Sequence, residues 1–383
     1  MSLNMIKIPT IYHGKGCLKE LRNFRQERIL IVTDTIVWKL FGEKVTKYFK
    51  NKEVKVFDEV EPDPKDTTIQ KAGEVAREFK PDLIIGLGGG SAMDVAKGVY
   101  FLYERVDKTL FDLNPVNYFK LGQKSKLVVI PTTSGTGAEN TMGIVVTKTA
   151  TGQKVPLAST EVTPAVVILD PNLPAGMPPK LTAVTGIDAL VHAIEGEINK
   201  LNSDFTEAIN LHAIKLIFQY LPAAFKKGAD DAVAREKMHN AASLAGIGFG
   251  NSSCAIGHSC GHALGGAFHL EHGIAVGVML PYVLEFNKPA SEGKYAEILK
   301  ALNVATDNPT ATLAKMVRNL LTEVNIPTNL KPLIAEPEWT KGFEKLVQFA
   351  KTDILVGLNP RTTTEADFRK IFQCAYEGRS VDW

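Results

Sequence analysis

One stretch of the sequence places a carboxylate and several histidines at spacings that suit a metal site. Asp188 and His192 lie in TGIDALVHAIE, where a spacing of four residues puts both side chains on one helix face, one turn apart. His258 and His262 repeat this spacing in GHSCGHALG, and His272 follows in FHLEHG. Mixed nitrogen and oxygen donors suit iron(II) or zinc and not calcium or magnesium. The pattern therefore predicts a transition-metal centre.

Spacing alone does not select the ligands. Seven of the eight histidines fall between residues 192 and 272, four of them between residues 258 and 272. A lone histidine in an apolar helix is more often a packed core residue, the interpretation we favour for His212 and His239. Cys254 and Cys260 are close enough to raise a thiolate–zinc alternative, but they form no C-x-x-C pair.

A glycine-rich loop, Gly88–Gly89–Gly90, lies between a predicted strand and a predicted helix. Glycines let the backbone approach an anion, and the free N–H groups of a helix N-terminus bind phosphate. Three consecutive glycines favour a pyrophosphate, although Ser91 and Asp94 also match a helix-capping pattern. The loop follows a later strand, whereas the usual dinucleotide fingerprint follows the first.

Two further segments suit a dinucleotide. Asp34 ends the first predicted strand, where it would either cap the next helix or accept hydrogen bonds from an adenosine ribose. On the ribose its charge would repel a 2′-phosphate, which favours NAD over NADP. The segment PTTSGTGAE (131–139) offers hydroxyls and glycines for the ribose and nicotinamide end, or an ordinary Ser/Thr turn.

The first part of the chain alternates short β-branched apolar runs with helical patterns, which predicts parallel strands covered on both faces. The predicted strands are 29–33, 54–57, 83–86, 127–131 and 166–169, and the predicted helices are 36–49, 69–79 and 92–103. After Pro178 apolar residues recur every three or four positions, which predicts helices. These helices are 211–220, 233–245, 294–302, 313–323 and 340–349. Prolines between Asp170 and Pro179 mark the expected boundary.

The gross composition agrees with a two-domain globular enzyme. The chain has 383 residues, 45% of them hydrophobic, and a formal net charge of +2. This charge predicts no nucleic-acid partner, and no apolar run reaches the roughly 20 residues that span a bilayer, so we expect no membrane partner. The N-terminal segment shows no secretory signal, and four scattered cysteines favour a reduced, cytoplasmic protein.

Four segments together resemble the iron-containing, or group III, alcohol dehydrogenase family. They are GGGSAMDVAKG (88–98), PTTSGTGAENT (131–141), LTAVTGIDALVHAIE (181–195) and GHSCGHALGGAFHLEHGIAVGVMLP (257–281). The resemblance covers essentially the whole chain. It implies a Rossmann-like α/β dinucleotide-binding domain over 1–178 and an all-α, metal-binding domain over 179–383, the dehydroquinate synthase-like fold.

The resemblance also assigns roles to individual residues. It implies Asp188, His192, His258 and His272 as metal ligands, and His262 as a catalytic residue that relays protons. The implied cofactor-binding residues are Asp34, Gly88, Gly89, Gly90, Ser91, Asp94, Thr132, Thr133, Thr136 and Lys154. Phe249 matches a residue that lines the substrate pocket. Glu271, which stands where many members have proline, and the two cysteines depart from the family pattern and put the choice of substrate in doubt.

The implied activity is that of a metal-dependent, NAD(H)-linked alcohol dehydrogenase or aldehyde reductase acting on a small primary alcohol or diol. Its expected cofactors are Fe²⁺, with Zn²⁺ as the alternative, and NAD rather than NADP. We expect a homodimer or a higher homo-oligomer. The competing interpretations are a zinc-dependent glycerol dehydrogenase, a dehydroquinate-synthase-like lyase and a catalytically silent NAD-binding protein. The lyase is disfavoured because its basic residues for a phosphorylated substrate are not found, and the silent protein because all four ligands are present.

Overall fold

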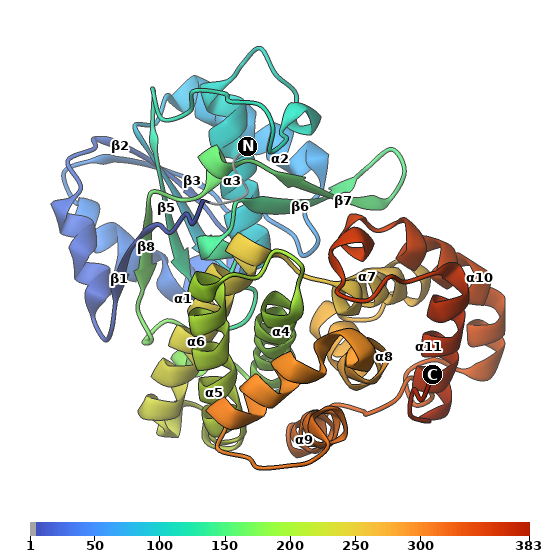
Figure 1. Ribbon diagram of the computed structural model, residues 1–383. Coiled ribbons are helices and arrows are strands. Elements are labelled where there is room, and N and C mark those ends of the chain that lie inside the picture. Colours follow the sequence, from blue (N-terminus) through green and yellow to red (C-terminus); the bar gives the residue numbers. More distant parts are fainter. Residues whose placement is uncertain (1–4) are drawn as a thin grey trace. The chain divides into compact units, whose positions relative to one another are not determined.

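The computed structural model describes residues 5–383, and the chain divides into two compact units, Met1–Gly176 and Met177–Trp383. Each unit has its own secondary-structure elements (Figure 1). Two clusters of buried apolar residues lie in the first unit and one in the second. The division falls in the proline-containing segment that follows the last strand of the first unit.

The first unit is built on a six-stranded parallel sheet in the order β1-β8-β5-β4-β2-β3. The strands are β1 (Thr10–His13), β2 (Arg28–Val32), β3 (Glu53–Phe57), β4 (Leu83–Gly88), β5 (Lys126–Pro131) and β8 (Val166–Leu169). Its helices are α1 (Thr35–Thr46), α2 (Asp66–Phe79) and α3 (Gly90–Glu104). Consecutive residues of β2 belong to different hydrophobic clusters. Leu30 lies in the cluster that includes residues of α2 and α3, and Ile31 lies in the cluster that includes Val45 of α1. Both faces of the sheet are thus covered, which explains the continuous apolar strands.

Three strands were not predicted from the sequence. β1 has only four residues, all of them partly or largely exposed, so it lacks the apolar run that marks a buried strand. β6 (Gly143–Lys148) and β7 (Gln153–Ala158) form a separate antiparallel hairpin. In β6 only Ile144 and Val146 are buried, and no residue of β7 is, so neither strand shows the continuous buried run of the strands in the sheet.

The second unit is helical and has one continuous core. Its helices are α4 (Pro179–Ile198), α5 (Asp204–Lys227), α6 (Ala232–Ser252), α7 (Ile256–Phe268), α8 (His272–Ala301), α9 (Pro309–Glu323), α10 (Glu336–Thr352) and α11 (Glu365–Glu377). α4 is buried along almost its whole length and packs against α5, α6 and α8. These elements confirm the predicted Rossmann-like α/β unit followed by an all-α unit.

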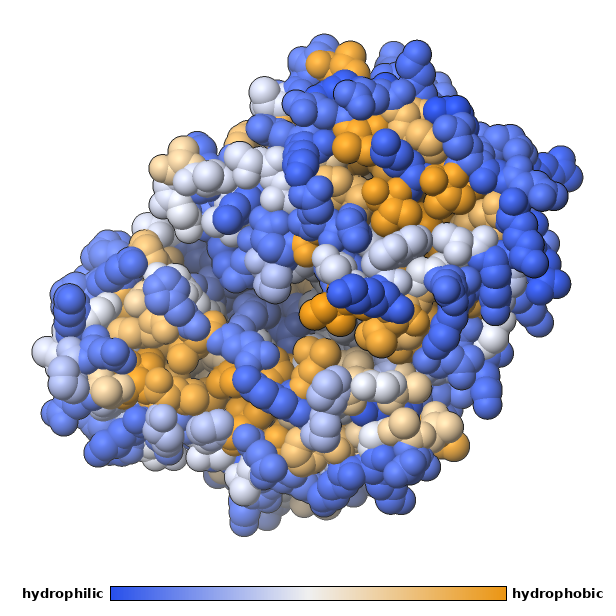
Figure 2. All heavy atoms as spheres, turned by 180° about the vertical axis from the view of Figure 1, so that it is seen from behind, coloured by the Kyte–Doolittle hydropathy of each residue, from blue (hydrophilic) through white to orange (hydrophobic). Residues whose placement is uncertain are grey.

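Hydrophilic residues predominate on the face shown in Figure 2, and apolar atoms gather there in separate patches. Within residues 5–383, no helix combines the length and the apolar character that a membrane span requires. All four cysteines are free and buried.

Candidate metal centre and cofactor loops

The metal centre is built on the buried helix α4. Asp188 and His192 lie one turn apart on this helix, and their side chains are 5% and 7% exposed. The Nδ1 atom of His192 lies 3.8 Å from Oδ2 of Asp188. The predicted placement of both side chains on one helix face is therefore confirmed.

Two further histidines reach the same carboxylate from other helices. His258 lies in the first turn of α7, and its Nε2 atom is 3.9 Å from Oδ1 of Asp188. His272 begins α8, and its Nε2 atom is 3.4 Å from the same oxygen. The rings of His192 and His258 stack with centroids 4.5 Å apart. The fold thus brings together the carboxylate and the three histidines that the family resemblance selected.

The donor atoms of this group fit a bound cation. Asp188 Oδ1, His192 Nδ1 and His258 Nε2 are buried and have no hydrogen-bond partner among residues 5–383. Buried polar atoms without partners are costly, so a cation among them would remove an otherwise unexplained penalty. Burial lowers the pKa of His192 to about 3, which keeps its ring neutral with a lone pair free to bind metal. Burial raises the pKa of Asp188, but the surrounding histidines outweigh it and hold that pKa below its usual range.

Glu195 holds the ring of His258 in place. This fully buried carboxylate lies one turn after His192 on α4, and its Oε2 atom is 2.6 Å from His258 Nδ1. It also accepts hydrogen bonds from the backbone N–H groups of Gly257 and His258 at the start of α7. With Nδ1 engaged by the carboxylate, Nε2 of His258 is the nitrogen left facing Asp188. A carboxylate behind a metal-binding histidine fixes the tautomer and the orientation of the ring.

We expect the Glu195→Gln variant to bind iron(II) about ten- to a hundredfold more weakly than the unmodified protein. The amide of the variant has the same shape as the carboxylate. Its N–H group, however, would face N–H donors of Gly257 and His258, which the carboxylate accepts in the unmodified protein. Competition with a chelator of known affinity measures the change, with circular dichroism to verify the fold. An unchanged affinity in folded protein would show that Glu195 does not support the centre.

His262, the predicted proton relay, lies beside this group but has a different partner. Its Nδ1 atom is 2.8 Å from Oδ2 of Asp353, and Oδ1 of Asp353 accepts a hydrogen bond from the backbone N–H of Leu355. The His262 ring centroid is 5.5 Å from that of His272. Burial lowers the pKa of His262, although the bond to Asp353 opposes this shift. The arrangement leaves a neutral ring beside the metal ligands, held by a carboxylate from the far side.

Phe249, the predicted pocket residue, lies on α6 and stacks on His192 with ring centroids 4.0 Å apart and an interplanar angle of 12°. An aromatic face beside a candidate ligand can exclude water and contact an alkyl chain. Its role in a substrate pocket stays a prediction.

In the first unit, the glycine loop meets the carboxyl ends of neighbouring strands. α3 begins at Gly90 directly after β4, and among residues 5–383 no side chain caps it. A Cβ atom on Gly88 would lie 2.7 Å from Cβ of Ala92, and Gly88 has a φ of 150°, so only glycine fits there. The uncapped helix start offers its N–H groups to an anion.

The threonine loop after β5 lies against this glycine loop. A Cβ on Gly89 would be 3.4 Å from Oγ1 of Thr133, and a Cβ on Gly90 would be 3.0 Å from Cγ2 of Thr136. Thr132 donates its backbone N–H to the carbonyl of Gly88 at 2.9 Å. The absence of side chains on the glycines therefore leaves room between two loops that carry N–H and hydroxyl groups, a surface that fits a dinucleotide phosphate.

Asp34 caps helix α1, which is one of the two roles proposed for it. Its Oδ1 atom caps α1 by accepting hydrogen bonds from the backbone N–H groups of Ile36 and Val37, both at 2.9 Å. Its Oδ2 atom points to the glycine loop and lies 3.7 Å from the position of a Cβ on Gly88. The carboxylate can thus cap the helix and still present one oxygen to a ribose.

Three other predicted cofactor residues have different surroundings. The capping interpretation of Ser91 and Asp94 is wrong, because the helix starts at Gly90, two residues before the start that Ser91 would cap, and Gly89 is its N-cap. Asp94 accepts a hydrogen bond from the backbone of β6 at Val145 N and lies 3.8 Å from Nζ of the buried Lys97. Burial raises the pKa of Asp94 to about 6. Its cofactor contact, like that of Ser91, stays a prediction.

Lys154 lies on β7, where its Nζ atom forms an ion pair with Oδ1 of Asp63 at 2.6 Å. Both side chains are partly exposed, so this pair is weak and the lysine can exchange its partner. Its predicted contact with the ribose remains to be tested.

Sequence reasoning missed Glu195 and Asp353. Glu195 carried a usable signal, because positions 188, 192 and 195 share one face of a helix. Asp353 carried none, since its partner His262 lies 91 residues away and the local sequence shows only a turn before the short helix Ile354–Leu358.

Comparison with protein families matches both units. A model described as iron-containing alcohol dehydrogenase matches residues 9–171, and one described as the C-terminal part of the Fe-containing alcohol dehydrogenase family matches residues 182–376. An NADPH-dependent butanol dehydrogenase of Clostridium saccharobutylicum is 41% identical, over 97% of this chain and 98% of the relative.

Comparison with solved structures finds similar folds over almost the whole chain. An iron-containing alcohol dehydrogenase of Thermococcus thioreducens superimposes with a TM-score of 0.90 at 30% identity, over 98% of this chain and 100% of the other. A sulfoacetaldehyde reductase of Bifidobacterium kashiwanohense in complex with NAD⁺ gives a TM-score of 0.88 at 28% identity, over 98% of this chain and 99% of the other.

Proposed function

Because the chain belongs to the iron-containing alcohol dehydrogenase family, we propose that this oxidoreductase interconverts a small primary alcohol or diol and its aldehyde, with NAD(H) and an iron(II) centre. We propose Asp188, His192, His258 and His272 as the ligands of that iron. The observation that carries this proposal is the set of buried donor atoms around Asp188 that have no hydrogen-bond partner within residues 5–383.

The residues in and around the proposed metal centre have different roles in the proposed reaction. When bound, the metal supplies a Lewis acid that lowers the pKa of an alcohol hydroxyl. Asp188 provides the one negative charge among the proposed ligands, and Glu195 keeps His258 oriented. We propose that His262 takes up the hydroxyl proton at Nε2, because Asp353 engages its Nδ1 atom.

The loops of the first unit fit the nicotinamide cofactor, which carries the hydride. The N–H groups at the start of α3 would hold the pyrophosphate, and Thr133 and Thr136 would contact it from the neighbouring loop. We propose NAD as the cofactor, because one oxygen of Asp34 stays beside the glycine loop and would repel a 2′-phosphate. The relatives differ on this point, since one is named for NADPH and another is seen with NAD⁺.

We expect the Asp34→Asn variant to raise the NADP-to-NAD ratio of kcat/KM at least about tenfold, because removing the charge removes roughly 1.5 kcal/mol or more of discrimination. Asparagine caps a helix as well as aspartate does, so stability should not change. Steady-state kinetics with both cofactors measures the ratio. A ratio equal to that of the unmodified enzyme would mean that Asp34 does not face the cofactor.

An NADH absorbance assay over a panel of alcohols tests the proposed function. Protein reconstituted with Fe²⁺ without oxygen should produce NADH from propanol, butanol and propanediols, lose this activity on chelation and regain it with Fe²⁺. Full activity after verified metal removal would overturn the proposal. Preference for glycerol with bound zinc would support the glycerol dehydrogenase alternative instead.

A further inference from the structure

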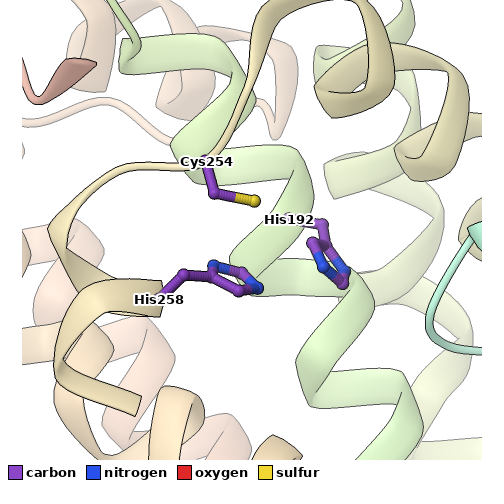
Figure 3. A group of neighbouring side chains, drawn as sticks. All are labelled: His192, Cys254 and His258. Atoms are coloured by element: carbon purple, nitrogen blue, oxygen red, sulfur yellow. The ribbon is translucent and has the colours of Figure 1, made fainter. Parts of the chain in front are cut away.

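A buried thiol lies beside two of the proposed ligands. Cys254 occupies the short connection between α6 and α7 and is 6% exposed. Its Sγ atom and one ring nitrogen each of His192 and His258 all lie within 4.8 Å of one another. Figure 3 shows the three side chains converging from α4, from the connection and from α7.

This group takes its two histidines from the proposed ligand set and adds the sulfur atom of Cys254. His192 Nδ1 and His258 Nε2 are buried atoms with no hydrogen-bond partner within residues 5–383. Asp188, His258 and His272 form a second group of donor atoms within the same distance of one another. His258 belongs to both groups, so one centre offers a nitrogen–sulfur set of donors beside a nitrogen–oxygen set.

The position of Cys254 is fixed by its surroundings. Asn199, the C-cap of α4, donates its side-chain N–H to the carbonyl of Cys254 at 2.6 Å. The preceding residue, Ser253, adopts a φ of 135°, a backbone conformation that side chains rarely accept. The connection is therefore held to the same helix that carries His192, and the thiol is held beside it.

We propose that Cys254 is an additional metal ligand that gives this centre a thiolate option for zinc, together with His192 and His258. One thiolate and two imidazoles are a common ligand set for zinc. A soft thiolate ligand favours zinc, whereas carboxylate and imidazole ligands also suit iron(II). On coordination the Cys254 thiol loses its proton and forms the sulfur–metal bond. The inference rests on the proposed metal centre and deepens it by naming the residue that sets which metal it takes.

Cobalt(II) substitution tests this ligation directly. Cobalt bound by any ligands of the centre gives visible d–d bands, and only a cobalt–thiolate bond adds an intense near-ultraviolet charge-transfer band. We expect both bands in the unmodified protein and the d–d bands alone in Cys254→Ser and Cys254→Ala. Cys260→Ala is the matched control, because Cys260 is fully buried two residues after His258 and belongs to neither donor group.

Zinc affinity, measured by chelator competition, gives a second readout. We expect Cys254→Ala to bind zinc at least about tenfold more weakly, while its affinity for iron(II) and the zinc affinity of Cys260→Ala stay unchanged. Two results would overturn the thiolate ligation but leave the metal centre in place. One is visible d–d bands without the charge-transfer band in the unmodified protein, and the other is a charge-transfer band that persists in Cys254→Ala. Absence of both bands would overturn the metal centre itself and with it the proposed function.

Discussion

The Asp188→Asn variant is expected to lose bound iron and about a thousandfold of its alcohol oxidation rate. Asp188 is the one anionic member of the proposed ligand set, and its oxygens lie 3.4 to 3.9 Å from nitrogens of three histidines. The amide has the same shape but no charge, so it cannot balance a divalent cation among neutral rings. Loss of a Lewis acid removes several kcal/mol of transition-state stabilisation, and about 4 kcal/mol corresponds to a thousandfold in rate.

Elemental analysis after anaerobic reconstitution and kcat/KM for butanol are the measurements. Glu197→Gln is a matched control, since Glu197 is a fully buried carboxylate on the same helix and lies 3.3 Å from Lys294 rather than in the centre. Burial raises the pKa of Glu197 to about 7, so this carboxyl is about half ionised near neutral pH and the amide removes only part of a charge. Normal iron content and turnover in Asp188→Asn would remove the basis for the proposed ligand set.

The fold was predictable from the sequence where burial requires a recognisable pattern of apolar residues. β2, β4 and β5 are covered on both faces, so nearly every residue must be apolar and the strands stand out. β1 and the β6–β7 hairpin have exposed faces, so their apolar runs are short or interrupted and do not stand out in the sequence. Tertiary pairing, which the sequence does not display, decides these elements.

The site was predictable only in pieces. Helical spacing placed Asp188 beside His192, because this proximity follows from the geometry of one helix. That His258 and His272 reach the same carboxylate depends on how α4, α7 and α8 pack, and only the family resemblance anticipated it. The capping motif at Ser91 gave a wrong prediction because the helix begins earlier, at Gly90, where no side chain of residues 5–383 caps its N–H groups.

The Asp353→Asn variant is expected to lower kcat for alcohol oxidation about a hundredfold while leaving iron content and KM nearly unchanged. Asp353 lies 2.8 Å from Nδ1 of His262 and fixes the proton on that nitrogen, which leaves Nε2 as the acceptor. An amide can donate to Nδ1 as well as accept from it, so the ring can adopt the opposite tautomer. Proton transfer by a positioned side chain contributes about a hundredfold or more.

Asp367→Asn serves as the control, because Asp367 also accepts a hydrogen bond from a backbone N–H at a helix start, at Thr364, but has no contact with His262 in the described chain. A double-mutant cycle separates positioning from general destabilisation. If Asp353 acts through His262, replacing it in the His262→Ala background should cost almost nothing further, since the ring it orients is gone. Additive losses in the double variant would instead mean that the two residues act independently. The carboxylate would then serve the local fold around residues 353–358 rather than the transfer of the proton.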